Sequence, residues 1–259
     1  MNRFCTAGVA IIAFCSMAVS QETASTAAAA SKTIRLAVLK GMPYSATRTI
    51  TITKLGADGR TTTQTLKSLL WRDAEGRTRQ EDINGNPATG EARTINISDP
   101  VARVGYAWCD GDDIDRQANP VFVNYTPKSW QEVDIWPNSP PSVKFRTQCN
   151  ADQMQSGRSN SNCQDLQPKM LNGIYVEGQR VTQVIPADIA GNGQSITGTS
   201  ETWTSPELEL TIYSVQDDPR TERSVLELMN IDRSKPDPSL FQPPTDRPKM
   251  DATQSHHPD

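Results

Sequence analysis

Polar and apolar side chains alternate along much of the chain with a period of two, which is typical of half-buried β-strands. Between residues 44 and 53 every second residue is serine or threonine, and the residues between them are Tyr44, Ala46, Arg48, Ile50 and Ile52. Many of these residues are β-branched, which favours strands. Similar stretches, separated by short turns, predict about nine strands in all, at residues 44–53, 61–71, 77–83, 93–98, 103–109, 173–185, 195–203, 207–215 and 223–231.

This pattern indicates the fold class. Many strands joined by short turns, with no convincing amphipathic helix between them, are typical of a mainly β protein with an antiparallel sheet. Threonine-lined strand faces suggest that one face of the sheet meets solvent while the other faces a core or a cavity. We therefore predict a single curved antiparallel sheet of half-barrel form.

Residues 110–170 break the pattern. This stretch is acidic from Asp110 to Asp115, holds three prolines between Trp136 and Pro141, and is polar from Gln155 to Asn162. No periodicity lasts long enough there to predict an element. We expect a long loop-rich insertion into the sheet, and loops of such length are often functional or mobile.

The N-terminal segment is typical of an export signal. Its apolar stretch over residues 8–19 is too short for a membrane-spanning helix, which needs about 20 apolar residues. Ala18 and Ser20 are the small residues that a signal peptidase requires at the −3 and −1 positions of the cleavage site. We expect residues 1–20 to be a signal peptide that is cleaved after Ser20. A lipoprotein signal with lipid on Cys15 is the alternative, although Phe14 is not the small residue expected before it.

The mature chain divides into a linker, one domain and a tail. Residues 21–40 begin with an Ala/Ser/Thr-rich tract that has no apolar stripe to bury, so we expect a linker. Residues 41–243 form the predicted half-barrel domain, including the insertion, and residues 244–259 the predicted disordered tail. No later segment is apolar enough to cross a membrane. The sequence therefore predicts a soluble or peripheral protein in the periplasm or outside the cell.

Charge and histidine content argue against several classes of function. The formal net charge is −4 and no Lys/Arg stripe supplies the clustered charge that nucleic acid binding needs. The two histidines, His256 and His257, both lie in the tail. The residue most often used for acid–base catalysis and for metal binding is therefore missing from the predicted domain. We expect no catalysis, no metal site and no cofactor.

Carboxylates leave one catalytic alternative open, because glycosidases work with two Asp or Glu residues. The acidic cluster at residues 110–115 and the pair Glu201 and Glu207, which flank Trp203, are the candidates. Acidic clusters in loops are mostly solvated. The cluster also does not match an EF-hand calcium loop.

Three cysteines follow the signal: Cys109, Cys149 and Cys163. An exported protein reaches an oxidising compartment, in which disulfides persist. Cys149 and Cys163 flank a polar loop whose closure by a crosslink is worth about 3 kcal/mol. We predict a Cys149–Cys163 disulfide, and a bond from Cys109 to either of the others is the alternative.

Aromatic residues supply the candidate ligand site. Tryptophans on strands most often pack in a core or at its rim, but some could line a groove for an apolar or glycan ligand. Two of the candidates lie in the insertion, where a lid would sit. The predicted ligand-binding residues are Trp71, Tyr106, Trp108, Trp130, Trp136 and Trp203.

Short segments at residues 71–79, 176–180, 200–208 and 236–241 occur in an order that resembles a family of uncharacterised secreted bacterial proteins. The resemblance covers most of the chain outside residues 110–170. The arrangement is also similar to the LolA/LolB and RseB-type half-barrels, in which a curved antiparallel sheet wraps an apolar cavity for lipid acyl chains. This second resemblance concerns architecture alone, and no lipid-site motif carries over residue by residue.

These observations lead to one expected function and two alternatives. We expect an exported, non-catalytic protein that binds an apolar or amphiphilic, lipid-like ligand in the concave face of a half-barrel. The first alternative is a protein-interaction or sensor module of the cell envelope, in which the sheet edge and the insertion engage a partner protein. The second is a carboxylate-dependent hydrolase.

Overall fold

The computed structural model describes residues 35–56, 58–86, 90–128, 130–137, 139, 160–190, 193–219 and 222–252. The predicted signal peptide at residues 1–20 lies outside these residues. Within them are the short helix α1 (Ala187–Ala190), the 3-10 helix η2 (Pro238–Phe241) and fourteen strands. The strands are β1 (Arg35–Leu39), β2 (Tyr44–Leu55), β3 (Thr61–Arg72), β4 (Thr78–Asn86), β5 (Gly90–Asp99), β6 (Val104–Gly111), β7 (Val121–Tyr125), β8 (Gln131–Ile135), β9 (Asn160–Leu171), β10 (Ile174–Ile185), β11 (Ile196–Ser205), β12 (Leu210–Asp217), β13 (Glu222–Asp232) and β14 (Lys249–Asp251).

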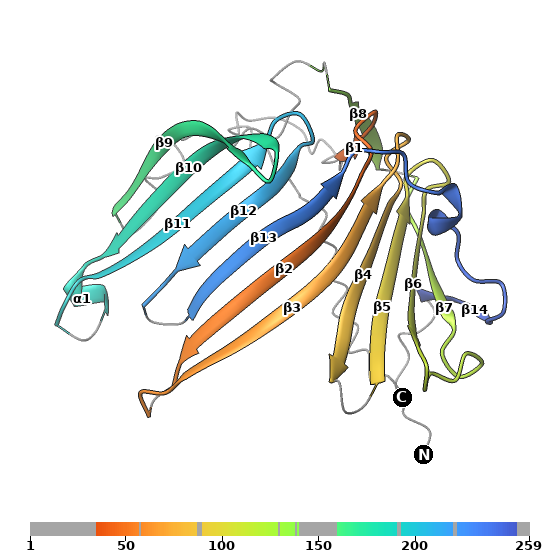
Figure 1. The fold of residues 1–259 in the computed structure, drawn as a ribbon, viewed down its shortest axis with the longest axis horizontal. Coiled ribbons are helices and arrows are strands. Elements are labelled where there is room, and N and C mark those ends of the chain that lie inside the picture. Colours follow the sequence, from red (N-terminus) through yellow and green to blue (C-terminus); the bar gives the residue numbers. More distant parts are fainter. Residues whose placement is uncertain are drawn as a thin grey trace, which may run out of the picture.

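Twelve of these strands form one large, open sheet in the order β14-β7-β6-β5-β4-β3-β2-β13-β12-β11-β10-β9. Neighbouring strands are antiparallel except for β14 and β7, which pair in parallel. Figure 1 shows the strands side by side in a twisted sheet with β9 at one edge and β14 at the other. The mainly β class and the large, mostly antiparallel sheet are confirmed.

The estimate of about nine strands is too low, because five strands lie where the sequence shows no alternation. β1 lies in the predicted linker, β14 in the predicted disordered tail, and β7, β8 and β9 within the predicted loop-rich insertion. β9 shows the reason: it pairs along most of its length with β10 but leaves most of its side chains exposed. Backbone hydrogen bonds hold such a strand in place even though its sequence shows no alternation of apolar and polar residues.

The β2–β3 hairpin forms the centre of the sheet. The two twelve-residue strands pair along their whole length, from Tyr44 with Arg72 to Leu55 with Thr61. Their many β-branched residues suit a pleated surface. Gly59 closes the turn with φ +76°, a conformation that favours glycine.

The pairing register assigns central side chains to two faces of the sheet. On the side we call the Trp71 face, one row crosses β3 to β7 through Trp71, Arg79, Ile97, Tyr106 and Val123. On the opposite side, the Tyr44 face, Tyr44 on β2 stands beside Arg72 on β3. The two faces differ in what covers them.

The Trp71 face of β5, β6 and β7 carries a buried apolar cluster. It consists of Ile95, Ile97, Val104, Trp108, Val121 and Val123. A second cluster, which includes Tyr44, Ala46, Ile212, Leu228 and Trp203, packs at the β2 and β10–β13 end of the sheet. Among the described residues, the sheet therefore carries an apolar cluster toward each of its two ends.

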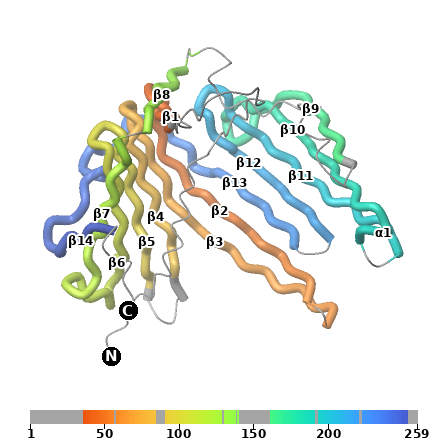
Figure 2. Tube along the Cα trace, turned by 180° about the vertical axis from the view of Figure 1, so that it is seen from behind, coloured from red at the N-terminus to blue at the C-terminus, as the bar shows by residue number. Residues whose placement is uncertain are grey.

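The C-terminal segment (residues 233–252) runs across the Trp71 face. Helix η2 packs against β4 and β5, and Arg79 Nη1 donates to the Leu240 carbonyl at 2.8 Å. Farther along, the buried Arg247 donates to the Cys109 carbonyl and to Asp110. The ordered β14 beside β7 corrects the prediction that the chain is disordered from residue 244 (Figure 2).

A small parallel sheet of β1 and β8 lies at the end of the large sheet that holds the β3–β4 turn (Figure 1). The Gly41 amide donates to the Ala74 carbonyl in that turn at 2.8 Å. Gly76, with φ +89°, lies so close to β1 that an added Cβ would stand 2.7 Å from Val38 Cγ1. No helix in the described part of the chain has the length and apolar character to span a membrane.

Candidate ligand-binding surface

Trp71 and Trp108, two of the predicted ligand residues, meet at Arg79. The guanidinium carbon of Arg79 lies 6.0 Å from the ring centroid of Trp71 and 5.5 Å from that of Trp108. Trp108 is only 5% exposed. Tyr106, two residues before Trp108 on β6, is half-buried. The Nζ atom of Lys249 in the C-terminal segment lies 6.0 Å from the centroid of its ring. Through Arg79, which donates to the Leu240 carbonyl, and through Lys249, this group of rings lies beside the C-terminal segment.

The two buried carboxylates of the described residues, Asp73 and Glu81, are both paired with arginine. Glu81 lies 2.7 Å from Arg79 and 2.9 Å from Arg93, so it bridges two cations. Asp73 accepts hydrogen bonds from Arg77 Nε at 2.6 Å and from backbone amides of its own turn. Each carboxylate thus has a structural role in charge pairing.

Trp203 lies on β11 near the other end of the sheet, where it is 4% exposed. Its ring covers Gly178 on β10, and Lys169 Nζ stands 3.6 Å from its centroid. Trp203 Nε1 donates to Glu201 Oε1 at 2.6 Å, and Arg180 donates to the other carboxylate oxygen at 2.7 Å. Burial raises the pKa of Glu201, but these hydrogen bonds and the positive charges of Arg180 and Lys169 together outweigh it and lower the pKa below its ordinary value.

Trp130 and Trp136 flank β8, which belongs to the small two-stranded sheet and not to the large one. Arg103 Nη2 donates to the Trp130 carbonyl at 3.1 Å. The Trp136 ring lies against Gly41 and remains 45% exposed. The six predicted residues therefore fall into three groups and do not form one site. Of the predicted disulfide, Cys163 lies on β9 and Cys149 lies outside the described residues, so the bond remains a prediction.

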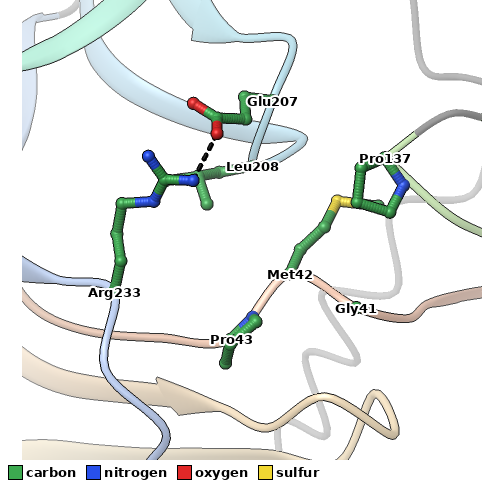
Figure 3. A pocket seen from close by; sticks show the side chains of 7 residues that line it. All are labelled: Gly41, Met42, Pro43, Pro137, Glu207, Leu208 and Arg233. Carbon is green, nitrogen blue, oxygen red and sulfur yellow. Dashed lines mark hydrogen bonds and ion pairs between the residues drawn. The ribbon is translucent and has the colours of Figure 1, made fainter.

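A small pocket opens where residues 41–43 meet the β11–β12 loop (Figure 3). Met42 and Pro137 line one side, and the ion pair of Arg233 with Glu207 lines another. Its volume is about 80 Å³, whereas ligand pockets usually enclose about 300–1,000 Å³. The pocket is therefore too small for a lipid chain.

A better candidate is an aliphatic row on the Tyr44 face of the central strands. Register places Leu226 of β13 beside Ile50 of β2, and Ile50 beside Leu66 of β3. Leu66 is 40% exposed, and Ile50 and Leu226 are half-buried. The row continues the buried cluster formed by Ala46 and Leu228 on the same strands. Apolar surface thus extends from a core onto an accessible part of the sheet.

Arg48 lies next to this row on the same face. It stands in register with Leu228 on one side and Ser68 on the other, and its Nη2 donates to Ser68 Oγ at 3.1 Å. Asp82 lies 3.6 Å from the same nitrogen. Arg48 Nε is buried and has no hydrogen-bond partner. The surface therefore combines aliphatic side chains with a cation whose donors are incompletely used.

The sequence-based prediction named aromatic residues and did not include this surface. The signal was present in the alternation of β2, where Arg48 interrupts the apolar side between Ala46 and Ile50. What the sequence lacked was the register that brings Leu66 and Leu226 beside Ile50. Among the residues that the structure describes, no cluster of three or more His, Cys, Asp or Glu could hold a metal ion.

Comparisons with known proteins give resemblances at low identity. A scan against protein-family models and a search of the curated proteins find no match. Among solved structures, a DUF1329 family protein from Desulfovibrio piger is 10% identical, with 78% of this chain and 90% of that chain covered and a TM-score of 0.19. A LolA superfamily protein from Nitrosomonas europaea is also 10% identical, with 78% and 91% covered and a TM-score of 0.21. With TM-scores this low, neither similarity indicates a function for this chain.

Proposed function

We propose that this chain is an exported, non-catalytic protein that binds an apolar or amphiphilic ligand on the Tyr44 face of a half-barrel sheet. The observation that supports this most directly is the accessible aliphatic row of Leu226, Ile50 and Leu66. Apolar side chains in the middle of a sheet are usually covered by another layer. A ligand with an extended hydrocarbon chain would supply such a cover.

The energetics favour a long, thin ligand over a compact one. Burying apolar area contributes about 25 cal/mol per Å² before the costs of association. A hydrocarbon chain that lies across three strands can reach all three residues of the row at once. A compact ligand would need an enclosed cavity, and the pocket near Met42 is too small for one.

Two measurements test the proposal. Lipid extraction and native mass spectrometry of protein purified from its own host are expected to reveal a bound apolar or amphiphilic molecule. In addition, Leu66→Gln is expected to weaken binding of the fluorescent apolar probe N-phenyl-1-naphthylamine by about fivefold, which corresponds to roughly 40 Å² of lost apolar contact.

The neighbouring Thr65 provides a matched control. It is exposed on the same strand but points to the opposite face, in register with Thr51. Thr65→Gln is expected to leave probe binding within twofold of the wild type. Equal binding by both variants, together with no co-purified ligand, would remove the proposal.

The edge strand β9 supports a second candidate, a protein-interaction module of the cell envelope. Among the described residues, β9 pairs with β10 on one side and with no strand on the other. An unpaired edge can accept a strand from a partner protein. Exposed Met170 and Tyr175 lie at the same hairpin. A photo-crosslinker at Gln164 is expected to capture one defined envelope protein. If no envelope protein is cross-linked, the result argues for the ligand-binding function alone.

A further inference from the structure

Arg48 has an unusual environment for a cation in the middle of a sheet. Its side chain is 20% exposed, so most of it is removed from water. A guanidinium offers five N–H donors, yet the hydrogen bond to Ser68 Oγ engages one nitrogen and Nε–H has no acceptor. A buried donor without an acceptor costs about 1–3 kcal/mol. The protein alone therefore leaves this cation incompletely satisfied.

Asp82 does not supply the missing hydrogen-bond acceptor for Arg48. Its carboxylate accepts a hydrogen bond from Ser68 Oγ at 2.6 Å and two from Gln80 Nε2 at 2.9 Å. The nearest contact with Arg48 is 3.6 Å, which is an ion pair without a hydrogen bond. The oxygens of Asp82 are thus largely engaged by its neutral neighbours, and Arg48 keeps donors for a further acceptor.

Arg48 lies on the same face as the aliphatic row and close to it. Arg48 and Ile50 are two residues apart on β2, so they share a face and lie about 6.8 Å apart along the strand. A ligand whose hydrocarbon chain covers Ile50 and Leu66 would therefore place a polar end group beside the guanidinium. Carboxylate and phosphate groups match guanidinium donors best in charge and geometry.

We propose that Arg48 forms a head-group subsite, so that the ligand of the Tyr44 face is an amphiphile with one anionic carboxylate or phosphate group at the end of a hydrocarbon chain. This inference rests on the proposed function and names the class of ligand. The chain covers the row of Ile50, Leu66 and Leu226, and the anionic group accepts from the partly exposed guanidinium of Arg48. Ser68 and Gln80 keep Asp82 engaged while the anion is bound.

The test compares two detergents that share a dodecyl chain, used below their critical micelle concentrations. Dodecyl phosphate carries an anionic head and dodecyl maltoside a neutral one. Calorimetric titration is expected to show tighter binding of dodecyl phosphate. Arg48→Gln is expected to lower the affinity for dodecyl phosphate by about tenfold or more, because a charged hydrogen bond is lost. Its affinity for dodecyl maltoside is expected to stay within twofold.

Two further variants sharpen the result. Lys67→Gln removes an exposed cation from the opposite face of β3 and is expected to change neither affinity. Asp82→Asn removes the competing carboxylate charge and is expected to strengthen dodecyl phosphate binding severalfold. If Arg48→Gln does not fold, Arg48→Lys replaces it, and a loss of at least threefold for dodecyl phosphate alone is expected because the planar donor set is gone.

The outcomes separate the two proposals. If neither detergent binds the wild type, the proposed function fails. If both bind and the ratio of their affinities does not change at Arg48, the ligand-binding function stands and the head-group subsite is overturned. Inorganic phosphate is expected to bind far more weakly than dodecyl phosphate, and equal binding of the two would show a site for a free anion instead of an amphiphile.

Discussion

The indole ring of Trp203 lies flat against the backbone of Gly178 on the neighbouring strand. A Cβ atom added to Gly178 would stand 2.5 Å from two ring atoms and 2.7 Å from a third. The two residues are register partners in the β10–β11 ladder. Glycine at position 178 thus makes room for the indole ring of Trp203. Lys169 Nζ also contacts the ring, at 3.6 Å from its centroid.

Gly178→Ala is therefore expected to destabilise the protein. The Trp203 ring is buried and hydrogen-bonded to Glu201, so it cannot move aside cheaply. Overpacking of this kind costs about 1–3 kcal/mol, to be measured by urea unfolding. Gly198→Ala on β11 is the control, because a Cβ there would lie 3.5 Å from its nearest neighbour, an ordinary contact. Equal unfolding midpoints for both variants would contradict the close approach at Gly178.

Trp203→Phe is expected to change how stability depends on pH. The Trp203 hydrogen bond helps to keep the pKa of Glu201 below its ordinary value, so the folded state favours the carboxylate. A lowered pKa contributes stability above the ordinary glutamate pKa of about 4.3, and this contribution is lost as the pH falls through the folded-state pKa. The variant should therefore lose more stability at pH 7 than at pH 3, measured by urea unfolding at both values. A loss that is the same at both would show that Trp203 acts through packing alone.

Arg247→Met is expected to loosen the C-terminal segment. The Arg247 side chain is 1% exposed and ties this segment to the Cys109 carbonyl and to Asp110 on β6. Its loss leaves Asp110 without its nearest cation. Limited proteolysis should cut the variant between residues 240 and 252 severalfold faster than the wild type. Lys249→Met, which removes an exposed cation of the same segment, should leave the cleavage rate unchanged.

Arg72→Lys is expected to destabilise the core although the side chain keeps its positive charge. Arg72 Nε donates to the Met42 carbonyl at 2.8 Å and Nη2 to the Leu208 carbonyl at 2.6 Å, while its guanidinium stacks 4.9 Å from the Tyr44 ring. Burial lowers the pKa of Arg72, and the nearby Tyr44 and Glu209 oppose that shift. A compact ammonium cannot span both carbonyls.

The expected cost of Arg72→Lys is about 2 kcal/mol in thermal or urea unfolding, from one buried carbonyl left without its donor. Arg60→Lys is the control, because the Arg60 side chain is 88% exposed in the β2–β3 turn. If both variants unfold at the same midpoint, the two hydrogen bonds contribute nothing measurable to stability.

The sequence predicted the central strands because their residues obey a local rule. Alternation between residues 44 and 53 follows from the pleat of a strand, and it placed β2 correctly and assigned Tyr44 and Ile50 to one face. The same rule failed for β9 and β14. Edge strands pair through their backbones and bury few side chains, so their sequences carry no period.

The burial of the aromatic residues is a second feature that the sequence does not encode locally. Composition indicated that Trp108 and Trp203 were candidates for a ligand groove, but both are nearly fully buried. Alternation specifies which side chains share a face. It does not specify which face another part of the chain covers, and here the C-terminal segment covers the face of Trp108.

By itself the sequence determined the mainly β class, the central hairpins and the two-sided character of β2, because each follows from residues close together in the chain. The tertiary structure alone decided that the aliphatic row joins β13, β2 and β3, and that Arg48 lies beside it with an unused donor. Leu66, Ile50 and Leu226 are brought together by strand pairing across more than 150 residues. Such register depends on the packing of the whole sheet, which no local pattern encodes.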